Sequence, residues 1–260
     1  MDELIRVKNT SYARYEELLM RRDKLKKEAF QWEMEYIREF GDRILKVFEL
    51  KLSCIRKKKT ISFCQAIANR GGVVDQNELQ EFLAQEMAAY QAQLESMIEE
   101  NNASKEMNEV PERDLLKIKK IYHKLAKQLH PDINPMTNQN EKLKELWQRV
   151  SIAYNCNNLK EMMEVEILVN AAIKELGTGN IEIEIPNIDE KIKELEAEIK
   201  KITETDPYMY KFLLEDPEAV QAKKDSLDEE LKTYEEYEKQ LDEILEGLMA
   251  NGVTVIWRMQ

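Results

Sequence analysis

Residues 112–154, ERDLLKIKKIYHKLAKQLHPDINPMTNQNEKLKELWQRVSIAY, are the stretch that decides the fold of this chain. Apolar side chains recur in its first half at spacings of three and four residues, the period of one helical face. They are Leu115, Ile118, Tyr122, Leu125 and Leu129. A second apolar set follows a polar loop and comprises Leu143, Leu146, Trp147, Val150, Ala153 and Tyr154. The pattern predicts two amphipathic helices that pack antiparallel as a finger.

A His-Pro-Asp corner, residues 130–132, ends the first of these helices. Pro131 has no amide hydrogen and disfavours the helical conformation at His130, so we expect the helix to stop there. Asn134-Pro135 then keeps the chain turning. Four lysines repeat at the helical period on the side opposite the apolar stripe, at positions 117, 120, 124 and 127. The pattern predicts that the corner and the lysine face both lie in water.

This segment resembles the J-domain of the DnaJ family of co-chaperones. The family's second-helix pattern, I-K-K-A-Y-R-K-L-A-x-x-x-H-P-D-x-N-P, is met by Ile118, Lys119, Lys120, Tyr122, Lys124, Leu125, Ala126, His130, Pro131, Asp132, Asn134 and Pro135. Its third-helix pattern, F-x-x-I-x-x-A-Y, is met by Trp147, Val150, Ala153 and Tyr154. The likeness covers about fifty residues. The family's first helix, with its Y-x-x-L-G signature, is not visible upstream, and the loop after the tripeptide is longer than usual.

J-domains bind a DnaK-type chaperone of the seventy-kilodalton heat-shock class and stimulate its ATP hydrolysis, and the resemblance implies the same here. The residues that it implies for chaperone binding are His130, Pro131, Asp132, Lys117, Lys119, Lys120, Tyr122, His123, Lys124, Lys127 and Asn134. The lysines would attract an acidic surface of the chaperone and raise the association rate. The tripeptide would bias the partner's conformation, an allosteric role without bond chemistry of its own.

Several of these residues also have a purely structural explanation. Trp147, Tyr154 and Tyr122 are typical core residues, although the Tyr122 hydroxyl can reach the surface. A lysine stripe is commonly no more than a solvated helix face. The basic run at 56–59 suits nucleic acid, but a solvated helix end, where cations meet the negative end of the helix dipole, explains it better.

Composition limits the remaining function classes. Charged residues make up 35% of the chain and glycine only seven positions, which favours helices over strands. No apolar stretch reaches the ~18–20 residues of a membrane span, and the N-terminus lacks the apolar core of a signal peptide. Cys54, Cys64 and Cys156 are an odd number without a C-x-x-C pair, so we expect neither a disulfide framework nor a zinc site, and a cytoplasmic location.

The first 103 residues are predicted to form an N-terminal helical bundle. We expect helices over 11–38 and 43–58, interrupted at Gly41-Asp42, a short helix over 61–69, and a helix over 76–100 that begins at a capping box of Asp75 and Glu78. A polar linker, 101–111, follows. Residues 104–176 form the J-domain-like segment with a trailing helix over 155–176. That helix is too apolar to be free and should pack back on the finger or the bundle, in place of the missing first helix.

Residues 177–260 are predicted to form an antiparallel coiled-coil hairpin whose base is a small antiparallel ribbon of strands 181–185 and 253–257. Its seams are Ile188, Ile192, Leu195, Ile199 and Ile202, then Leu227, Leu231, Tyr234, Leu241, Leu245 and Leu248, with Glu238 as a polar gap. Residues 187–250 hold 20 acidic and nine basic side chains, which argues against nucleic acid. A patch of Tyr208, Tyr210, Phe212 and Leu213 at the tip either contacts a client or packs inside the bend.

The sequence thus predicts an all-α protein with three consecutive regions, and a co-chaperone rather than an enzyme. No Walker loop, paired metal carboxylates or Cys/His set is visible, so no cofactor, metal or catalytic residue is expected. The client, the particular chaperone and the pairing of the seams within one chain or between two copies stay open. The alternative is a J-like assembly scaffold that no longer engages a chaperone, which a His-Pro-Asp corner buried by another helix would indicate.

Overall fold

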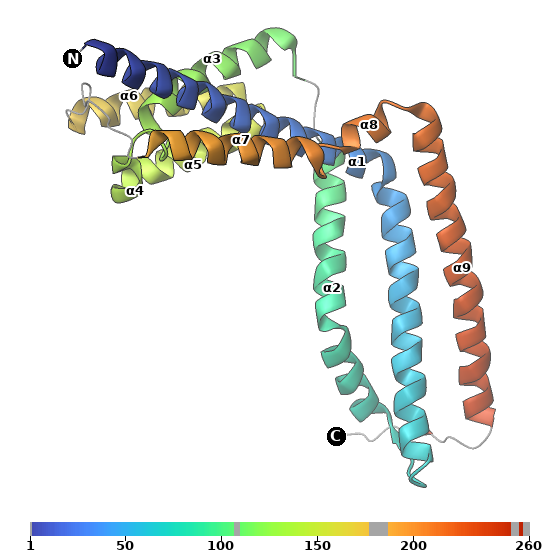
Figure 1. The fold of residues 1–260 in the computed structure, drawn as a ribbon. Helices are drawn as coiled ribbons and strands as arrows, with labels where there is room; N and C mark the ends of the chain where they lie inside the picture. Colours follow the sequence, from blue (N-terminus) through green and yellow to red (C-terminus); the bar gives the residue numbers. More distant parts are fainter. Residues whose placement is uncertain (1, 107–109, 177–186, 251–254, 257–260) are drawn as a thin grey trace. The chain divides into compact units, whose positions relative to one another are not determined.

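The computed structural model describes residues 2–106, 110–176, 187–250 and 255–256. This part of the chain is mainly helical, with nine helices and two very short strands (Figure 1). The helices are α1 (Asp2–Ala68), α2 (Gln76–Glu106), α3 (Glu112–Leu129), α4 (Met136–Gln139), α5 (Glu141–Asn155), α6 (Leu159–Leu176), α7 (Ile188–Glu204), α8 (Tyr210–Leu214) and α9 (Pro217–Ala250). The strands are β1 (Val74–Asp75) and β2 (Val255–Ile256). No helix in the described part is long and apolar enough to cross a membrane.

The chain forms two compact units, and neither is continuous in sequence. The first unit combines residues 1–33 with 108–210, and the second combines 34–107 with 211–260. This differs from the three consecutive regions expected from the sequence. The reason is α1, which contributes its first part to one unit and the remainder to the other, so that each unit is completed by a later stretch of chain.

The expected break at Gly41-Asp42 is wrong, because α1 runs through both residues. Glycine inside a helix costs only about 1 kcal/mol relative to alanine, which a long helix tolerates. Its small size is used here, since a Cβ at Gly41 would clash with Oδ1 of Asn101 on α2. Asn101 Nδ2 in turn donates to Asp42 Oδ1 at 2.8 Å. This contact also explains why α2 continues to Glu106, into the stretch predicted to be a polar linker.

The core of the first unit is the predicted finger together with its trailing helix. Side chains of α3, α5 and α6 share one buried cluster, namely Ile118, Tyr122, Leu125, Ala126, Leu129, Leu143, Leu146, Val150, Ala153, Tyr154, Met162, Val165, Val169 and Ala172. The Tyr122 ring stacks on Tyr154 at 3.8 Å, whereas His130, later in the chain, meets the earlier Trp147 at 4.8 Å. The two helices are therefore antiparallel. The prediction that α6 packs back on the finger is confirmed.

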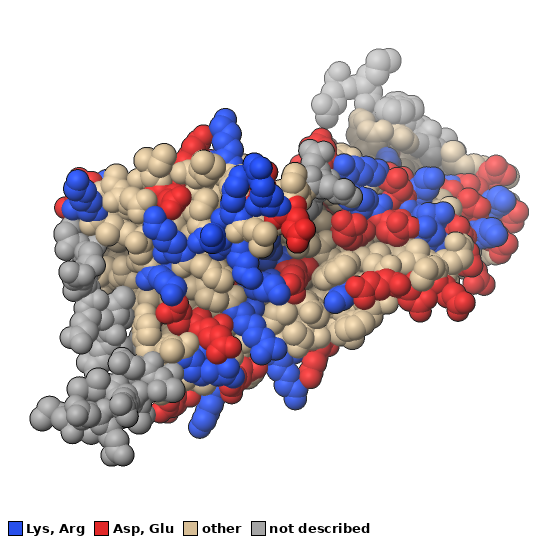
Figure 2. All heavy atoms as spheres, turned by 90° about the horizontal axis from the view of Figure 1, so that it is seen from above, with Lys and Arg blue, Asp and Glu red and all other residues tan. Residues whose placement is uncertain are grey.

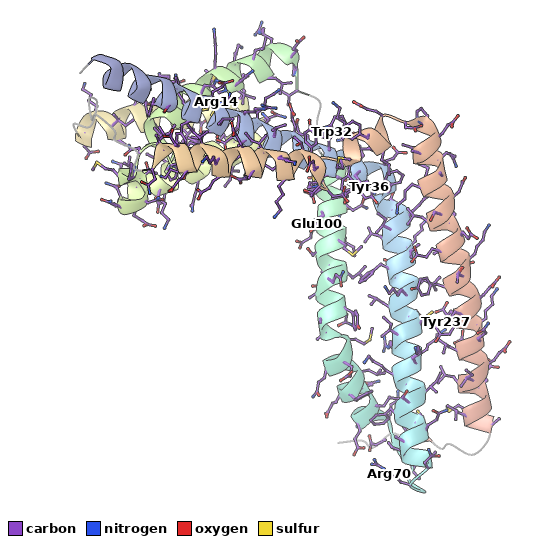
Figure 3. All side chains as sticks on the ribbon, viewed as in Figure 1. Arg14, Trp32, Tyr36, Arg70, Glu100 and Tyr237 are labelled. Atoms are coloured by element: carbon purple, nitrogen blue, oxygen red, sulfur yellow. The ribbon has the colours of Figure 1, made fainter. Side chains whose placement is uncertain are left out.

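A second cluster of the first unit joins α1 to α7. It contains Tyr15, Leu18, Leu19 and Leu25 of α1 and Leu195 and Ile199 of α7, and Ile133 is its single fully buried member from the finger. The seam predicted over 188–202 is thus buried, but against α1. Arg14 adds an ion pair from α1 to Glu196 of α7 at 3.1 Å (Figure 3).

The second unit places α9 and α2 against the later part of α1. Cys54 and Ile61 of α1 pack with Leu241 and with the half-buried Tyr234, Tyr237, Leu245 and Leu248 of α9. Glu238, the polar gap in that seam, accepts a hydrogen bond from Ser53 and lies 3.1 Å from Lys57. Asp75 caps α2 as predicted, because its Oδ1 accepts from Asn77 N at 2.8 Å and Glu78 N at 3.4 Å.

The seams of α7 and α9 therefore do not pair as the predicted coiled-coil hairpin, because each is covered by α1 within its own unit. Charge supplies a physical reason. α9 carries 11 acidic and four basic side chains, whereas α1 carries 16 basic and 11 acidic ones, so α1 offers the opposite charge. The basic run at 56–59 is partly neutralised in this way. Lys57 pairs with Asp242 at 2.6 Å, and Lys59 pairs with Glu86 at 2.5 Å.

The two strands also differ from the expected antiparallel ribbon. β2 lies within the predicted last strand, 253–257, but it pairs in parallel with β1, with Val74 opposite Val255 and Asp75 opposite Ile256. The sequence gives no strand signal at β1, which is two residues long. The other predicted strand, 181–185, lies outside the described residues.

Candidate functional site at the His-Pro-Asp corner

The corner is a hydrogen-bonded turn at the end of α3. His130 is the C-terminal cap residue, with φ −59° and ψ 126°, so the helix stops at the residue before proline as predicted. Its carbonyl accepts from the amides of Ile133 at 2.8 Å and Asn134 at 2.7 Å. The amide of Asp132 donates to His130 Nδ1 at 3.0 Å. The backbone and the imidazole ring are therefore held in one arrangement.

The imidazole ring of His130 is buried, with only 6% of its side chain exposed. It contacts the edge of Trp147, and its Nε2 lies 3.1 Å from Arg22 Nη2 and 3.6 Å from Asp23 Oδ2. Burial lowers the pKa of His130 below its ordinary value, against the opposing pull of the Asp23 and Asp132 carboxylates. The ring is neutral near pH 7.

Arg22 and Asp23 of α1 form the polar lid over this ring. Arg22 donates to Asp132 Oδ2 at 3.2 Å and to Asp23 Oδ1 at 2.8 Å. The hydroxyl of Tyr122 donates to the other oxygen of Asp23 at 2.6 Å. Burial and the Asp23 carboxylate raise the pKa of Tyr122 well above its usual range. Glu198 of α7 lies 3.6 Å from Arg22, so α7 supports the lid from outside.

Further contacts on both sides of the lid hold α1 to the finger. Tyr15 donates to the carbonyl of Asp132 at 3.4 Å, and Glu16 pairs with Lys127 at 2.6 Å. Lys27 places its Nζ 4.0 Å above the Tyr154 ring. Burial lowers the pKa of Lys27 to about 8, and no carboxylate pairs with it among the described residues.

The corner is therefore not in water, and that part of the sequence prediction is wrong. His130 is covered, Pro131 is half-buried, and the Asp132 side chain keeps 43% of its surface exposed. The cause is α1, whose approach from more than one hundred positions away the finger's own sequence does not predict. Arg22 and Asp23 were missed because adjacent opposite charges on a helix resemble an ordinary solvated face.

The lysine face is exposed as predicted. Lys119 and Lys120 make no ion pair within the described part of the chain, whereas Lys117 pairs with Asp114 at 3.1 Å and Lys124 with Glu166 at 2.8 Å. Basic and acidic side chains interleave over the molecular surface seen in Figure 2. Two other predicted contacts are less available. His123 is half-buried, which lowers its pKa, and the Asn134 amide is used locally, donating to Gln128 O at 2.8 Å.

The predicted aromatic patch is dispersed by its surroundings. Tyr208 packs half-buried against the α1–α7 cluster, and Tyr210 and Leu213 are half-buried as well. Phe212 alone among the four is well exposed, at 57%. A single exposed ring does not make a binding patch.

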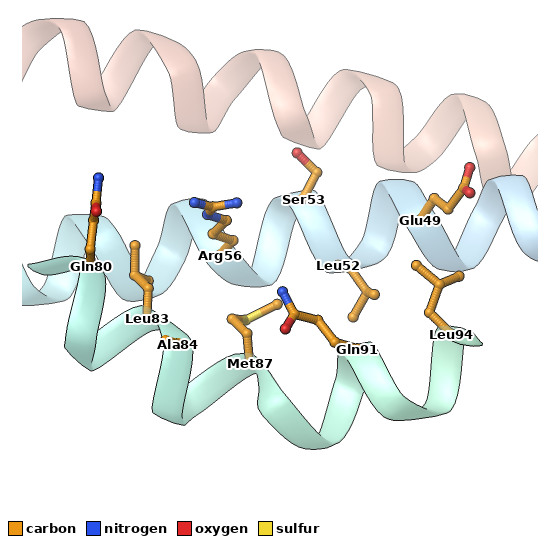
Figure 4. Close-up of a pocket in the computed structure, with 10 residues that line it drawn as sticks. All are labelled: Glu49, Leu52, Ser53, Arg56, Gln80, Leu83, Ala84, Met87, Gln91 and Leu94. Carbon is orange, nitrogen blue, oxygen red and sulfur yellow. The ribbon is translucent and has the colours of Figure 1, made fainter. Parts of the chain in front are cut away.

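A groove of about 610 Å³ lies between α1 and α2 in the second unit (Figure 4). Leu52, Leu83, Met87 and Leu94 form its apolar part, and Arg56, Gln80 and Gln91 border it. Its lining contains one carboxylate, Glu49, and no histidine or cysteine, so it offers no pairing of a nucleophile with a base. Within the described residues no cluster of potential metal ligands is present, and Cys54, Cys64 and Cys156 are free thiols.

Comparison with protein-family models, with curated protein sequences and with solved structures finds no match to this chain.

Proposed function

We propose that this protein is a co-chaperone that binds a DnaK-type chaperone through α3 and the His-Pro-Asp corner and stimulates its ATP hydrolysis. One observation carries the proposal. The residues that resemble the J-domain motif lie on two antiparallel helices in one core, with the tripeptide at the end of the first. A chance tripeptide needs no such setting. Free thiols suit the reducing cytoplasm, where we place the protein.

In this proposal the exposed face of α3 guides association. Lys119 and Lys120 keep their charge uncompensated, so they attract an acidic partner surface over a range of about 8 Å at physiological salt. Binding should therefore weaken as ionic strength rises. The corner supplies a rigid contact, because the hydrogen bonds on His130 O and Nδ1 fix its shape.

The protein acts on its partner's chemistry and performs none itself. His130 is neutral, but its ring nitrogens face Arg22 and the Asp132 amide, with no serine or cysteine hydroxyl or thiol beside it to activate. The proposed effect is a shift in the chaperone's conformational equilibrium towards the state that hydrolyses ATP.

The burial of His130 favours a second candidate, a J-like scaffold that serves assembly and no longer engages a chaperone. In that case Arg22, Asp23 and Asp132 are structural, and their ion pairs only fasten α1 to the finger.

Steady-state ATP hydrolysis by a DnaK-type chaperone of the same organism decides between the two. We expect the full-length protein to increase the rate and His130→Gln to abolish the increase. Lys119→Glu/Lys120→Glu should raise the concentration needed for half-maximal effect, because it reverses two attracting charges. Absence of stimulation by both the wild-type chain and the Arg22→Glu variant described below would overturn the co-chaperone proposal and leave the scaffold.

A further inference from the structure

We infer that residues 15–27 of α1, the cover segment, are an autoinhibitory lid that must leave the His-Pro-Asp corner before the chaperone can bind. This inference rests on the proposed function and concerns the control of the same site.

The cover segment and a chaperone would compete for the same atoms. Arg22 occupies both the Oδ2 atom of Asp132 and the Nε2 side of His130. Tyr15 donates to the backbone carbonyl of Asp132, and Glu16 neutralises Lys127 on the lysine face. A partner that needs the imidazole ring of His130 cannot reach it while Arg22 and Asp23 lie over it. The closed arrangement is therefore incompatible with full engagement of the corner.

The finger does not need the cover segment for its own core. The cluster of α3, α5 and α6 is formed by those three helices, and α1 contributes to it only the half-buried Met20. The cluster between α1 and α7 is separate, and Ile133 is its one buried residue from the finger. The cover and the finger thus have two distinct cores. α1 and α7 can move away together without dismantling either of them.

The interface between the two cores is largely polar, which makes it easier to open. Ion pairs of Arg22 and Asp23 exchange protein partners for water, whereas separating apolar surfaces costs about 25 cal/mol per Å². A small opening of about 140 Å³, bordered by Arg22, Asp132 and Glu198, already admits water beside the network. Lys27 adds a buried cation without a carboxylate partner in the described chain, and its desolvation is relieved when the lid opens.

The test compares Arg22→Glu with Arg21→Glu in the full-length chain. Glutamate at position 22 faces Asp23, Asp132 and Glu198, so like charges replace three attractions and open the lid. Arg21 is the matched control, because it is exposed on the same helix turn and makes no ion pair within the described residues. A closed fraction reduces the apparent affinity in proportion. We expect Arg22→Glu to lower the half-maximal concentration in the ATPase assay by roughly 5- to 150-fold, the usual range of such couplings. Arg21→Glu should behave like the wild type.

An independent readout follows the lid without any chaperone. The chain has only two histidines, His123 and His130, so their ring signals in an NMR spectrum are readily assigned. Diethyl pyrocarbonate, which acylates accessible imidazole, should spare His130 in the wild type and in Arg21→Glu and modify it at least tenfold faster in Arg22→Glu.

Each outcome bears on a separate claim. Equal stimulation by the wild type and Arg22→Glu would overturn the inference and retain the co-chaperone function. A His130 that stays protected in a folded Arg22→Glu variant would overturn it as well, because the charge network would not be what holds the lid. An accessible His130 without stimulation by any variant would overturn the proposed function, and with it the inference. Stimulation by Arg22→Glu that vanishes in Arg22→Glu/His130→Gln would support both.

Discussion

Removal of one hydroxyl group tests whether α1 lies on the finger in solution. Tyr122→Phe deletes the hydrogen bond from the Tyr122 hydroxyl to Asp23 Oδ2, which is 2.6 Å long and joins α3 to α1. Tyr122 is 3% exposed, so water cannot take the place of the missing donor without local opening. The rest of the ring, including its stack on Tyr154, is retained.

The magnitude follows from the charge of the acceptor. Hydrogen bonds to charged groups contribute about 1.5–3 kcal/mol, and the loss of a buried partner adds desolvation. Asp23 keeps the guanidinium of Arg22 at 2.8 Å, so the lower end of the range applies. We expect the free energy of unfolding of the first unit to fall by about 1.5 kcal/mol, equivalent to a melting temperature roughly 3–6 °C lower.

Urea unfolding followed by circular dichroism measures this change, with Tyr154→Phe as the matched control. Tyr154 lies in the same core and stacks on Tyr122, but its hydroxyl makes no hydrogen bond to the described residues. The control should therefore cost less than about 0.5 kcal/mol. Equal losses in the two variants would refute the reasoning, because the Tyr122 hydroxyl would then be in water and α1 away from the corner.

Three further predictions concern single positions. Because burial lowers the pKa of His130 below 6.5, the unfolded chain binds the proton more tightly, so the free energy of unfolding should fall as pH drops through 6.5; His130→Gln should flatten that slope. The pKa of Lys27, lowered to about 8, makes stability rise between about pH 8 and 10.5; Lys27→Met should remove this rise in urea titrations and stabilise the chain at pH 7 by about 1 kcal/mol. Gly41→Ala should cost the second unit about 1–3 kcal/mol by displacing Asn101, measured by thermal melting. Gly247→Ala, where a Cβ meets open space inside α9, should instead stabilise by about 0.5–1 kcal/mol.

Local sequence determined the helices that carry the candidate site. Period and proline placement suffice for the stripe of α3 and its end at His130, because both act within a few residues of the backbone that they shape. The same holds for the cap at Asp75 and for the buried faces of α7 and α9. Identical reasoning placed a break at Gly41, where a local cost of about 1 kcal/mol was outweighed by packing against Asn101.

The tertiary structure alone decided what those faces pack against. A heptad seam shows that one face is buried, but it does not name the partner, and α1 has the charge to attract both acidic helices. The contacts of Arg22 with His130 and Asp132 span more than one hundred positions, and no spacing rule reaches that far. The sequence by itself therefore determined the finger and its corner, whereas only the long-range packing of α1 decided that the corner is covered.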